Sequence, residues 1–344
     1  MTPLQFIQIP AFCAALMLFA CGGETDNASP PAEISSAAES NGFSFSSSSS
    51  TIWLLPPASS PRPMAGFDNL GATCHANAAL KFLIHSTEPQ RLIKHLIGVV
   101  AASDAVHREA AMRFIELIES SYSETGPTPQ DLNDFLASLQ KLPAFSLLDG
   151  NGNMNFPIVG QAQDVNDFLM KLSESFALHP LHANTLALKD DANAFKTHEE
   201  YWTILRPASA DDSLQDVFDR TIPASWQVTP SKDLRQLTVR MENAVDDAQG
   251  RRMLGNRNFD FNSAVLLKTT DGKRTTTLTL EPREVIEFVG ADSTGHYIAY
   301  AKDTQWVRYD DAQVTVMDQM PAIENVRLIN FVITKIASDF SSAS

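Results

Sequence analysis

Cysteine is scarce in this sequence, and its scarcity excludes several classes of protein. The 344 residues contain three cysteines, Cys13, Cys21 and Cys74. Three thiols cannot build a disulfide framework, and there is no Cys-x-x-Cys pair to hold a zinc ion with thiolates. Cys13 and Cys21 lie in an apolar leader, so the remaining domain has one thiol. We expect neither a metal nor a cofactor.

Positive charge is also in short supply. The chain has 26 Lys and Arg residues against 41 Asp and Glu residues, which gives a formal net charge of -15. Binding to a phosphate backbone needs clustered Lys and Arg, so the composition argues against a nucleic-acid partner and favours a basic one. The alternative is that the acidity only aids solubility.

The longest apolar run, residues 4–20, is shorter than the roughly 20 residues that cross a bilayer. It ends in small residues before Cys21, as an export signal does. The segment Leu18-Phe19-Ala20-Cys21-Gly22 resembles a bacterial lipobox, which would imply a lipid anchor at Cys21. The first ten residues lack the Lys or Arg that normally opens such a signal, and a misassigned start codon is the alternative. We expect export from a bacterial cell, as a secreted protein or an outer-membrane lipoprotein.

Composition divides the chain into four segments. Residues 1–21 form the expected signal peptide. Residues 22–63 are rich in Ser, Pro and Ala, with too little apolar surface to offset chain entropy, and are expected to be a disordered linker. Residues 64–337 form the folded domain, and residues 338–344 are a disordered tail.

Within the domain, helical periodicity comes first and strand periodicity follows. Apolar residues at spacings of three and four, and a Thr128 cap before Pro129, predict helices. These span residues 76–86, 89–103, 105–122, 129–139 and 164–176. Short runs rich in Val, Ile, Thr and aromatic residues predict strands at 236–241, 263–269, 274–280, 284–290, 296–302, 305–311 and 326–335. The fold class is α+β with a mainly antiparallel sheet, and a site at the junction of the two halves.

The most informative segment runs from Gly66 to Asn77, GFDNLGATCHAN, before an apolar helix. It places Cys74 at a helix N-terminus, where the helix dipole and free N–H groups favour the reactive thiolate. The same N–H groups could receive an oxyanion, and Asn69 could add a side-chain donor. The alternative is that Cys74 is a small buried core residue.

A thiol nucleophile needs a base, and the best candidate is His296 in Gly295-His296-Tyr297. A hairpin would bring Asp310 or Asp311, at the end of the next strand, beside the imidazole. That carboxylate would orient the ring and support its charged form. The alternative is a structural His and two solvated turn aspartates.

The first segment resembles the cysteine box of the ubiquitin-specific protease family, and GHYIAY with QWVRYDD resembles its histidine box. The resemblance implies a papain-like site between a helical thumb and a β palm, with ubiquitin as partner. It makes Cys74 the nucleophile, His296 the base, Asp310 the orienting group with Asp311 as the fallback, and Asn69 an oxyanion donor.

A weaker match concerns substrate binding. Residues 163–169, QDVNDFL, resemble a family segment whose acidic residues contact the basic ubiquitin tail, which assigns that task to Asp164 and Asp167. Gly295 and Tyr297, on either side of His296, are further substrate-binding candidates. The family's leading Gln falls on Ala162, the zinc-binding cysteine pairs of its fingers are absent, and the stretch near 180–260 is short, so reduced fingers are expected.

Three functions follow from this sequence. The first is a secreted deubiquitinase that cleaves after the C-terminal Gly of ubiquitin in host conjugates. The second is an envelope-located Cys-His amidase or cell-wall endopeptidase, which a lipobox would suit. The third is a catalytically silent ubiquitin binder, which the joint presence of Cys74, His296 and Asp310 disfavours.

Overall fold

The structure is a computed structural model, and its described residues all lie in one compact unit that starts at Phe45. The described ranges are 49–53, 65–87, 89–146, 158–161, 163–178, 187–189, 195–197, 203–205, 207, 212–222, 236–242, 244–246, 252–254, 259–270, 274–291, 294–323 and 325–340. The expected signal peptide, its Cys21 and most of the expected linker lie outside these ranges.

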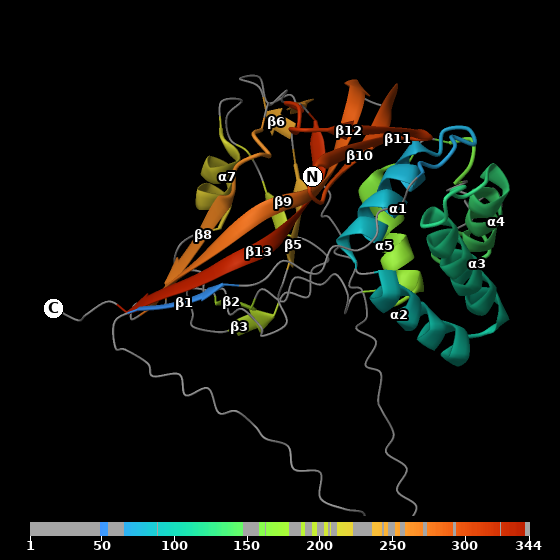
Figure 1. Ribbon diagram of the computed structural model, residues 1–344, viewed down its shortest axis with the longest axis horizontal. Coiled ribbons are helices and arrows are strands. Elements are labelled where there is room, and N and C mark those ends of the chain that lie inside the picture. Colours follow the sequence, from blue (N-terminus) through green and yellow to red (C-terminus); the bar gives the residue numbers. More distant parts are fainter. Residues whose placement is uncertain are drawn as a thin grey trace, which may run out of the picture. The chain divides into compact units, whose positions relative to one another are not determined.

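Five helices follow the short strand β1 (Ser49–Trp53) and lie together on one side of the sheet (Figure 1). They are α1 (Cys74–Ser86), α2 (Pro89–Ala102), α3 (Ala105–Ser121), α4 (Pro129–Leu139) and α5 (Val165–Ser175). Their starts follow local chemistry. Thr128 and Asp131 form a capping box at α4, with Pro129 at its first position, and Asp164 caps α5.

The second half of the domain is a sheet with the order β12-β11-β10-β9-β13-β5-β4. Its strands are β4 (Thr203–Leu205), β5 (Gln236–Met241), β8 (Val265–Thr270), β9 (Arg274–Ala291), β10 (Thr294–Lys302), β11 (Trp306–Asp310), β12 (Gln313–Met317) and β13 (Val326–Phe340), with β1 (Ser49–Trp53) on β13 and β8 on β9. All pairs are antiparallel except β4 with β5. The prediction of helices followed by a mainly antiparallel sheet is confirmed.

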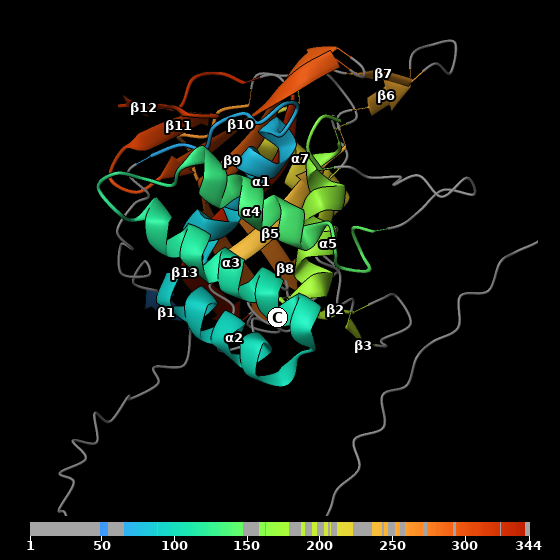
Figure 2. The same ribbon diagram turned by 90° about the vertical axis from the view of Figure 1, so that its right-hand side faces the viewer.

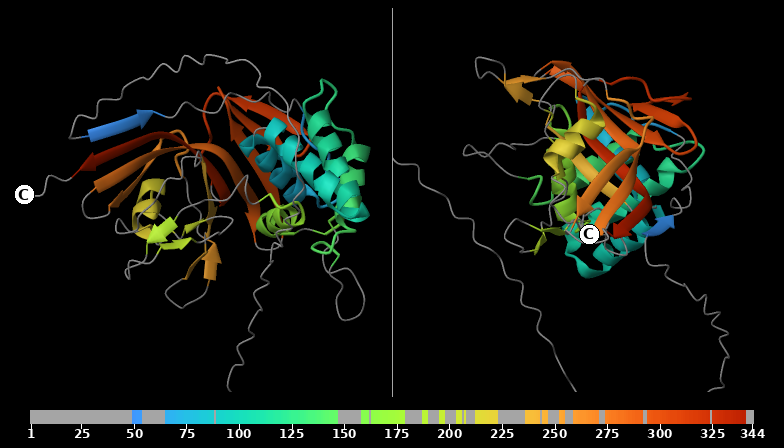
Figure 3. Two further views of the ribbon diagram at one scale, coloured as in Figure 1. Left: turned by 90° about the horizontal axis from the view of Figure 1, so that it is seen from below. Right: turned by 90° about the vertical axis from the view of Figure 1, so that its left-hand side faces the viewer.

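Helices α1 to α5 cover one face of this sheet, and α7 (Leu214–Thr221) packs on the other face. Figure 2 looks onto the helices with the sheet behind them, and Figure 3 shows the same layers from below and from the side of α7. Each face has its own core. Phe114, stacked on Phe135 at 4.8 Å, lies in the helix-side core, and Phe218 of α7 packs on Phe331 in the other.

Two short hairpins occupy what the structure describes of the region around residues 180–260. They are β2 (Ala187–Lys189) with β3 (Phe195–Thr197), and β6 (Ala244–Asp246) with β7 (Arg252–Leu254). Much of this stretch lies outside the described residues, so the expectation of reduced fingers stays a prediction.

The strand boundaries differ from expectation near Pro282. Two strands were expected, yet β9 continues from Arg274 to Ala291. Pro282 has no N–H to give to a ladder, but it pairs with Phe331 where the register of β13 shifts. Such a bulge accommodates a proline without ending the strand.

Both ends of the domain also extend further than expected. Residues 49–53, inside the expected linker, form β1, and β13 continues three residues past the expected end at 337, to Phe340. The two segments pair with each other, Ser49 opposite Asp339. Backbone hydrogen bonding along the long β9 and β13 ladder therefore orders residues whose composition alone predicts disorder.

One edge of the sheet is closed by a side chain. Gln215 of α7 accepts a hydrogen bond from the Leu266 N–H and donates one to the Leu266 carbonyl, both at 2.8 Å. The amide thus satisfies the outward backbone groups of Leu266 in the way a neighbouring strand would. In the described part of the chain, no helix has the length and hydropathy of a membrane span.

A buried polar cluster crosses the middle of the sheet. Asn330 of β13 donates to the Glu284 carboxyl on β9 at 2.8 Å and accepts from Thr238 on β5 at 2.9 Å. Glu284 is 4% exposed, and burial raises its pKa from 4.5 to about 7 despite the Asn330 hydrogen bond and the nearby Arg283 charge. The carboxyl is therefore held in its neutral form at mildly acid pH.

This pKa predicts a pH-dependent stability. The folded state binds the Glu284 proton more tightly than the unfolded state, so stability is lost as pH rises from about 4.5 through 7, in total by about 3 kcal/mol. Glu284→Gln keeps an acceptor for Asn330 and removes the ionisation. Urea unfolding at pH 5 and pH 8 should show that its advantage over the wild type grows with pH.

Glu281→Gln is the matched control, because Glu281 is exposed on the same strand. It should leave the difference between the two pH values unchanged. An equal effect of Glu284→Gln at both pH values would contradict a neutral Glu284 in the folded protein.

Candidate active site

The loop before α1 is shaped by the side chain of Asn69. Its carbonyl oxygen accepts hydrogen bonds from the N–H groups of Gly71, at 3.0 Å, and Thr73, at 3.2 Å. Gly71 and Ala72 adopt positive φ values of 102° and 53°. For Ala72, which has a Cβ atom, this conformation costs roughly 1 kcal/mol. The chain thereby reverses direction and enters α1 directly at Cys74.

Cys74 is the first residue of α1 and is 5% exposed. The Thr73 side chain does not cap the helix, because its hydroxyl accepts from the Leu70 N–H instead. The first N–H groups of a helix have no partner within the helix, and the helix dipole is positive there. Cys74 therefore lies at the N-terminus of a helix, where the sequence places it.

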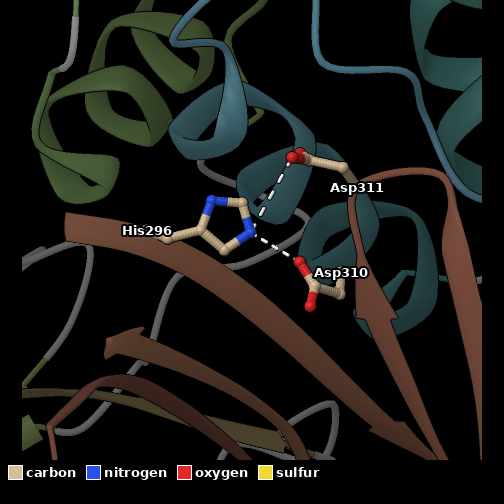
Figure 4. Close-up of side chains that lie close together, drawn as sticks. All are labelled: His296, Asp310 and Asp311. Carbon is tan, nitrogen blue, oxygen red and sulfur yellow. Dashed lines mark hydrogen bonds and ion pairs between the residues drawn. The ribbon is translucent and has the colours of Figure 1, made fainter. Parts of the chain in front are cut away.

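His296 and Asp310 come together from neighbouring strands, β10 and β11. Tyr300 pairs with Arg308 in this hairpin, and side chains two residues apart share a face, so His296 and Asp310 project from the same face. The His296 Nε2 atom lies 2.6 Å from Asp310 Oδ1, as Figure 4 shows. The other carboxylate oxygen accepts from Arg308.

His296 also contacts Cys74. A hydrogen bond with the thiol, and then those with Asp310 and the charge of Asp311, raise the pKa of His296 from 6.5 to about 9, against the opposing effect of partial burial. Asp310 has a lowered pKa, because its bonds to His296 and Arg308 outweigh desolvation. The imidazole is therefore charged at neutral pH between a thiol and a carboxylate.

Asp311, the next residue, joins this hairpin to the cysteine loop. Its carboxylate accepts from the Asn69 amide at 2.8 Å and from the Asn77 amide at 2.7 Å, and its backbone carbonyl accepts from the Phe67 N–H. One carboxylate oxygen lies 3.7 Å from His296 Nε2, as drawn in Figure 4. Asp310 is thus the direct partner of His296, and Asp311 is placed between the two halves of the site.

Two residues make this approach of the loop to the hairpin feasible. Gly66 lies so close to the hairpin turn that a Cβ atom there would be 2.0 Å from the Asp311 carbonyl oxygen. Asn77, one turn into α1 and 3% exposed, donates to Asp311 and to the carbonyl of Asp68. The sequence alone indicates no role for either residue, although both lie in the segment from Gly66 to Asn77.

Lys81 fixes the start of the same loop. The residue is 1% exposed. Its Nζ atom donates to the Ala65 carbonyl at 2.7 Å and lies 3.8 Å from the centre of the Phe67 ring. Burial lowers the pKa of Lys81 from 10.5 to about 7. The cation–π contact and the carbonyl partly compensate the cost of burying this amine.

The predicted substrate-binding residues lie at the start of α5 and on β10. Asp164 caps α5 and interacts electrostatically with His75 and Tyr297, while Asp167 is exposed in the first turn of α5. Tyr297 is buried, and its pKa is raised to about 12 by burial and then by the negative charge of Asp164. Gly295 packs against Phe288, and a Cβ atom there would be 2.0 Å from that ring.

His75 is adjacent to the nucleophile in sequence but is built differently from His296. It is fully buried, with Nδ1 3.1 Å from the Ala72 carbonyl and its ring edge-on to Phe168. Burial lowers the pKa of His75 to about 4. It is therefore neutral at physiological pH and does not compete with His296 for the proton of the thiol.

His296, Asp310 and Asp311 also form the one group of potential metal ligands among the described residues, with ligand atoms within 4.8 Å of one another. The Nε2 atom that would bind a metal is the one that contacts Asp310. A raised pKa keeps that nitrogen protonated, whereas a metal ligand must be a neutral imidazole. The donor set fits a hydrogen-bonded triad better than a cation site.

Comparison with known proteins adds information on the fold. No protein-family model matches the sequence, and no curated protein is detectably similar to it. Solved structures match over most of the chain. The SAGA Ubp8/Sgf11/Sus1/Sgf73 DUB module bound to ubiquitin aldehyde has a TM-score of 0.55 at 14% identity, covering 81% of this chain and 71% of the other.

Related structures give the same result. The module bound to monoubiquitin has a TM-score of 0.55 at 13% identity, covering 81% of this chain and 71% of the other. A yeast SAGA DUB module with an Sgf73 variant has a TM-score of 0.54 at 13% identity, covering 81% and 70%. At such identities the likeness concerns the fold alone, and the chain has a fold of the ubiquitin-specific protease type.

Proposed function

We propose that the protein is a cysteine-dependent deubiquitinase that hydrolyses the bond after the C-terminal Gly of ubiquitin. The observation that carries the proposal is the Cys74 thiol at a helix N-terminus, in contact with a charged His296 that is bonded to Asp310. The fold likeness to deubiquitinating modules supports the substrate class.

The proposed reaction has two steps, formation of a thioester on Cys74 and its hydrolysis. The Cys74 thiolate attacks the carbonyl carbon of the terminal glycine, and His296 gives its proton to the leaving amine. Water then attacks the thioester, His296 accepts its proton, and the thiolate leaves. Asp310 keeps the imidazole in the orientation and charge state that both steps need.

The oxyanion of each intermediate would be held at the start of α1. The backbone N–H of Cys74 and the Asn69 amide are the proposed donors. The Asn69 amide nitrogen has two hydrogens, and one of them goes to Asp311. Asp311 therefore fixes the direction of the amide, which is a positioning role in addition to its charge near His296.

The helices α1 to α5 and the sheet would act as thumb and palm, with the ubiquitin tail between them. Asp164 and Asp167 are the proposed contacts for basic residues of that tail, and Gly295 and Tyr297 the contacts beside the scissile bond. The chain's net charge of -15 suits a basic partner. Export through the apolar leader, with or without a lipid at Cys21, would direct the enzyme to conjugates of a host cell.

The first test is covalent labelling of the full chain with ubiquitin that carries an electrophile at its C-terminus. The wild type should form an adduct, Cys74→Ala should form none, and His296→Ala should react at least about a hundredfold more slowly, because the charged imidazole that stabilises the Cys74 thiolate is lost. The adduct is read by mass spectrometry.

His107→Ala is the matched control, since it removes an imidazole of α3 outside the site, and it should react like the wild type. A wild type that ignores ubiquitin while iodoacetamide labels Cys74 quickly would sink the substrate assignment. The envelope amidase, tested on peptidoglycan fragments, would then take its place.

The raised pKa of His296 predicts an alkaline limit to activity. His296 must be protonated to release the amine, so kcat/KM on a ubiquitin C-terminal amide should fall as pH rises through about 9. Asp310→Asn removes one cause of the raised pKa and should move this limit to lower pH. Asp318→Asn removes a carboxylate at the far end of β12 and should leave the profile unchanged, while an unmoved limit in Asp310→Asn would contradict the assigned pairing.

The Asp311 contact predicts that Asn77 matters for reactivity. Asn77→Ala leaves the Asp311 carboxylate and the Asp68 carbonyl without a buried donor, which costs about 1–3 kcal/mol of stability, and adduct formation should slow about tenfold or more. Asn262→Ala is the control, because the exposed Asn262 likewise bridges two distant segments, through both backbone groups of Met320, away from the site. Asn262→Ala should lose stability but form the adduct at the wild-type rate. If Asn77→Ala and Asn262→Ala formed the adduct equally fast, the positioning role of Asn77 would be contradicted.

A further inference from the structure

Two outer strands of the sheet, β8 and β12, differ in whether their outward backbone groups are bonded. On the outer edge of β8, the Gln215 amide bonds both backbone groups of Leu266. The strand β12 ends the sheet on the other side, and among the described strands it pairs with β11 alone. Sheet edges that are left open are templates for pairing with another chain.

β12 has none of the usual protections of an edge. Its sequence, Gln-Val-Thr-Val-Met, contains no charge and no proline, and its register with β11 is continuous from Trp306↔Met317 to Asp310↔Gln313, without a bulge. Residues 313–316 are exposed and Met317 is half-buried. Edge strands of natural proteins that avoid pairing with another chain carry lysines, prolines or bulges.

The backbone groups of β12 that point outward can be assigned from this register. Asp310 pairs with Gln313 across the two-residue turn, and such a turn closes on a pair that exchanges both hydrogen bonds. Pairs alternate along an antiparallel ladder, so Gln313, Thr315 and Met317 bond towards β11. The N–H and C=O groups of Val314 and Val316 therefore point away from the sheet.

The side chains of this strand are arranged symmetrically about Thr315. Val314 pairs with Tyr309 and Val316 with Val307, so both valines lie on the helix-side face, where they are 37% and 57% exposed. A second copy running antiparallel, with Thr315 opposite Thr315, would put each Val314 opposite a Val316. Four outward backbone groups on each copy would then find partners, and four valines would meet on one face.

We propose that β12 is a self-association edge at which two copies of this chain pair antiparallel about Thr315. The occupant is a second copy because the strand is complementary to itself in register, in hydrogen-bonding groups and in side-chain face. Such a pairing is isologous and closes as a two-fold dimer. It buries less than the about 1,000 Å² of a stable interface, so the dimer is weak. It does not depend on the proposed catalysis, and Cys74→Ala protein should pair equally well.

The register is tested by disulfide trapping at high protein concentration, in 0.5 M NaCl to screen the like net charges, where about 3 to 4 Å of Debye length remains. The full chain carries Cys13→Ser, Cys21→Ser and Cys74→Ser. Thr315→Cys places two thiols across the axis in a pair without hydrogen bonds, where Cβ atoms are about 4.5–5.5 Å apart, and should cross-link to itself under mild oxidation.

Gln313→Cys is the matched control, because it lies on the same face but opposite Met317 of the other copy. It should not cross-link to itself, and it should cross-link when mixed with Met317→Cys protein. Equal self-cross-linking of Gln313→Cys and Thr315→Cys would overturn the register and with it the proposal.

Sedimentation velocity of the otherwise unchanged chain provides the second measurement. A concentration-dependent dimer should be seen, and Thr315→Lys, which sets two like charges opposite each other, should raise its dissociation constant about fivefold or more. Ala101→Lys, the same charge added on the exposed part of α2, should leave it unchanged. A strictly monomeric protein, or a dimer insensitive to Thr315→Lys, would overturn the proposal, and the edge would then be open to an extended segment of another protein.

Discussion

Asp311 holds together two segments that are 242 residues apart in the chain, and the rest of the site depends on this contact. Its carboxylate binds the amides of Asn69 and Asn77, and its carbonyl binds the Phe67 N–H. Without it, the cysteine loop and the hairpin that carries Asp310 would lose their shared carboxylate and keep the interaction of Cys74 with His296, the contact of His85 with Tyr309 and the packing of α1 on β10 and β11. Because hydrogen bonds to an ionised group are stronger than neutral ones, one residue can fix both the loop and the turn.

The same contact explains the division of labour between two adjacent aspartates. Asp310 lies at the end of β11, on the face of His296, and shares its charge between the imidazole and Arg308. Asp311 lies in the turn, with a positive φ of 51°, so its side chain leaves the strand alternation and faces the cysteine loop. A single step in sequence thus separates the residue that bonds His296 from the one that holds the loop before Cys74.

Much of this arrangement was predictable, because it follows from local patterns. Apolar spacings and the Thr128 cap indicated all five helices of the first half, and two adjacent strand patterns indicated a hairpin that brings Asp310 or Asp311 beside His296. The sequence could not reveal that Lys81 is buried, since a lysine in an apolar helix normally extends to solvent. The link from Asn77 to Asp311 was equally hidden, because it depends on how two distant segments meet. The short elements α7 and β12 were missed for a different reason: eight and five residues are too few for a periodic signal.

The fold and the side chains place different demands on the sequence. A fold of this type at 14% identity requires only that apolar residues of suitable volume fill the two cores, and many sequences satisfy that condition. Such a likeness shows the fold alone, since one fold serves many functions. Catalysis requires particular atoms at particular places: a thiol at a helix start, an imidazole whose pKa is raised to about 9, and a carboxylate 2.6 Å from it. A protein that kept the fold only to bind a partner would have no need for a charged imidazole beside its one described thiol, which is why the side chains, more than the fold, favour an enzyme.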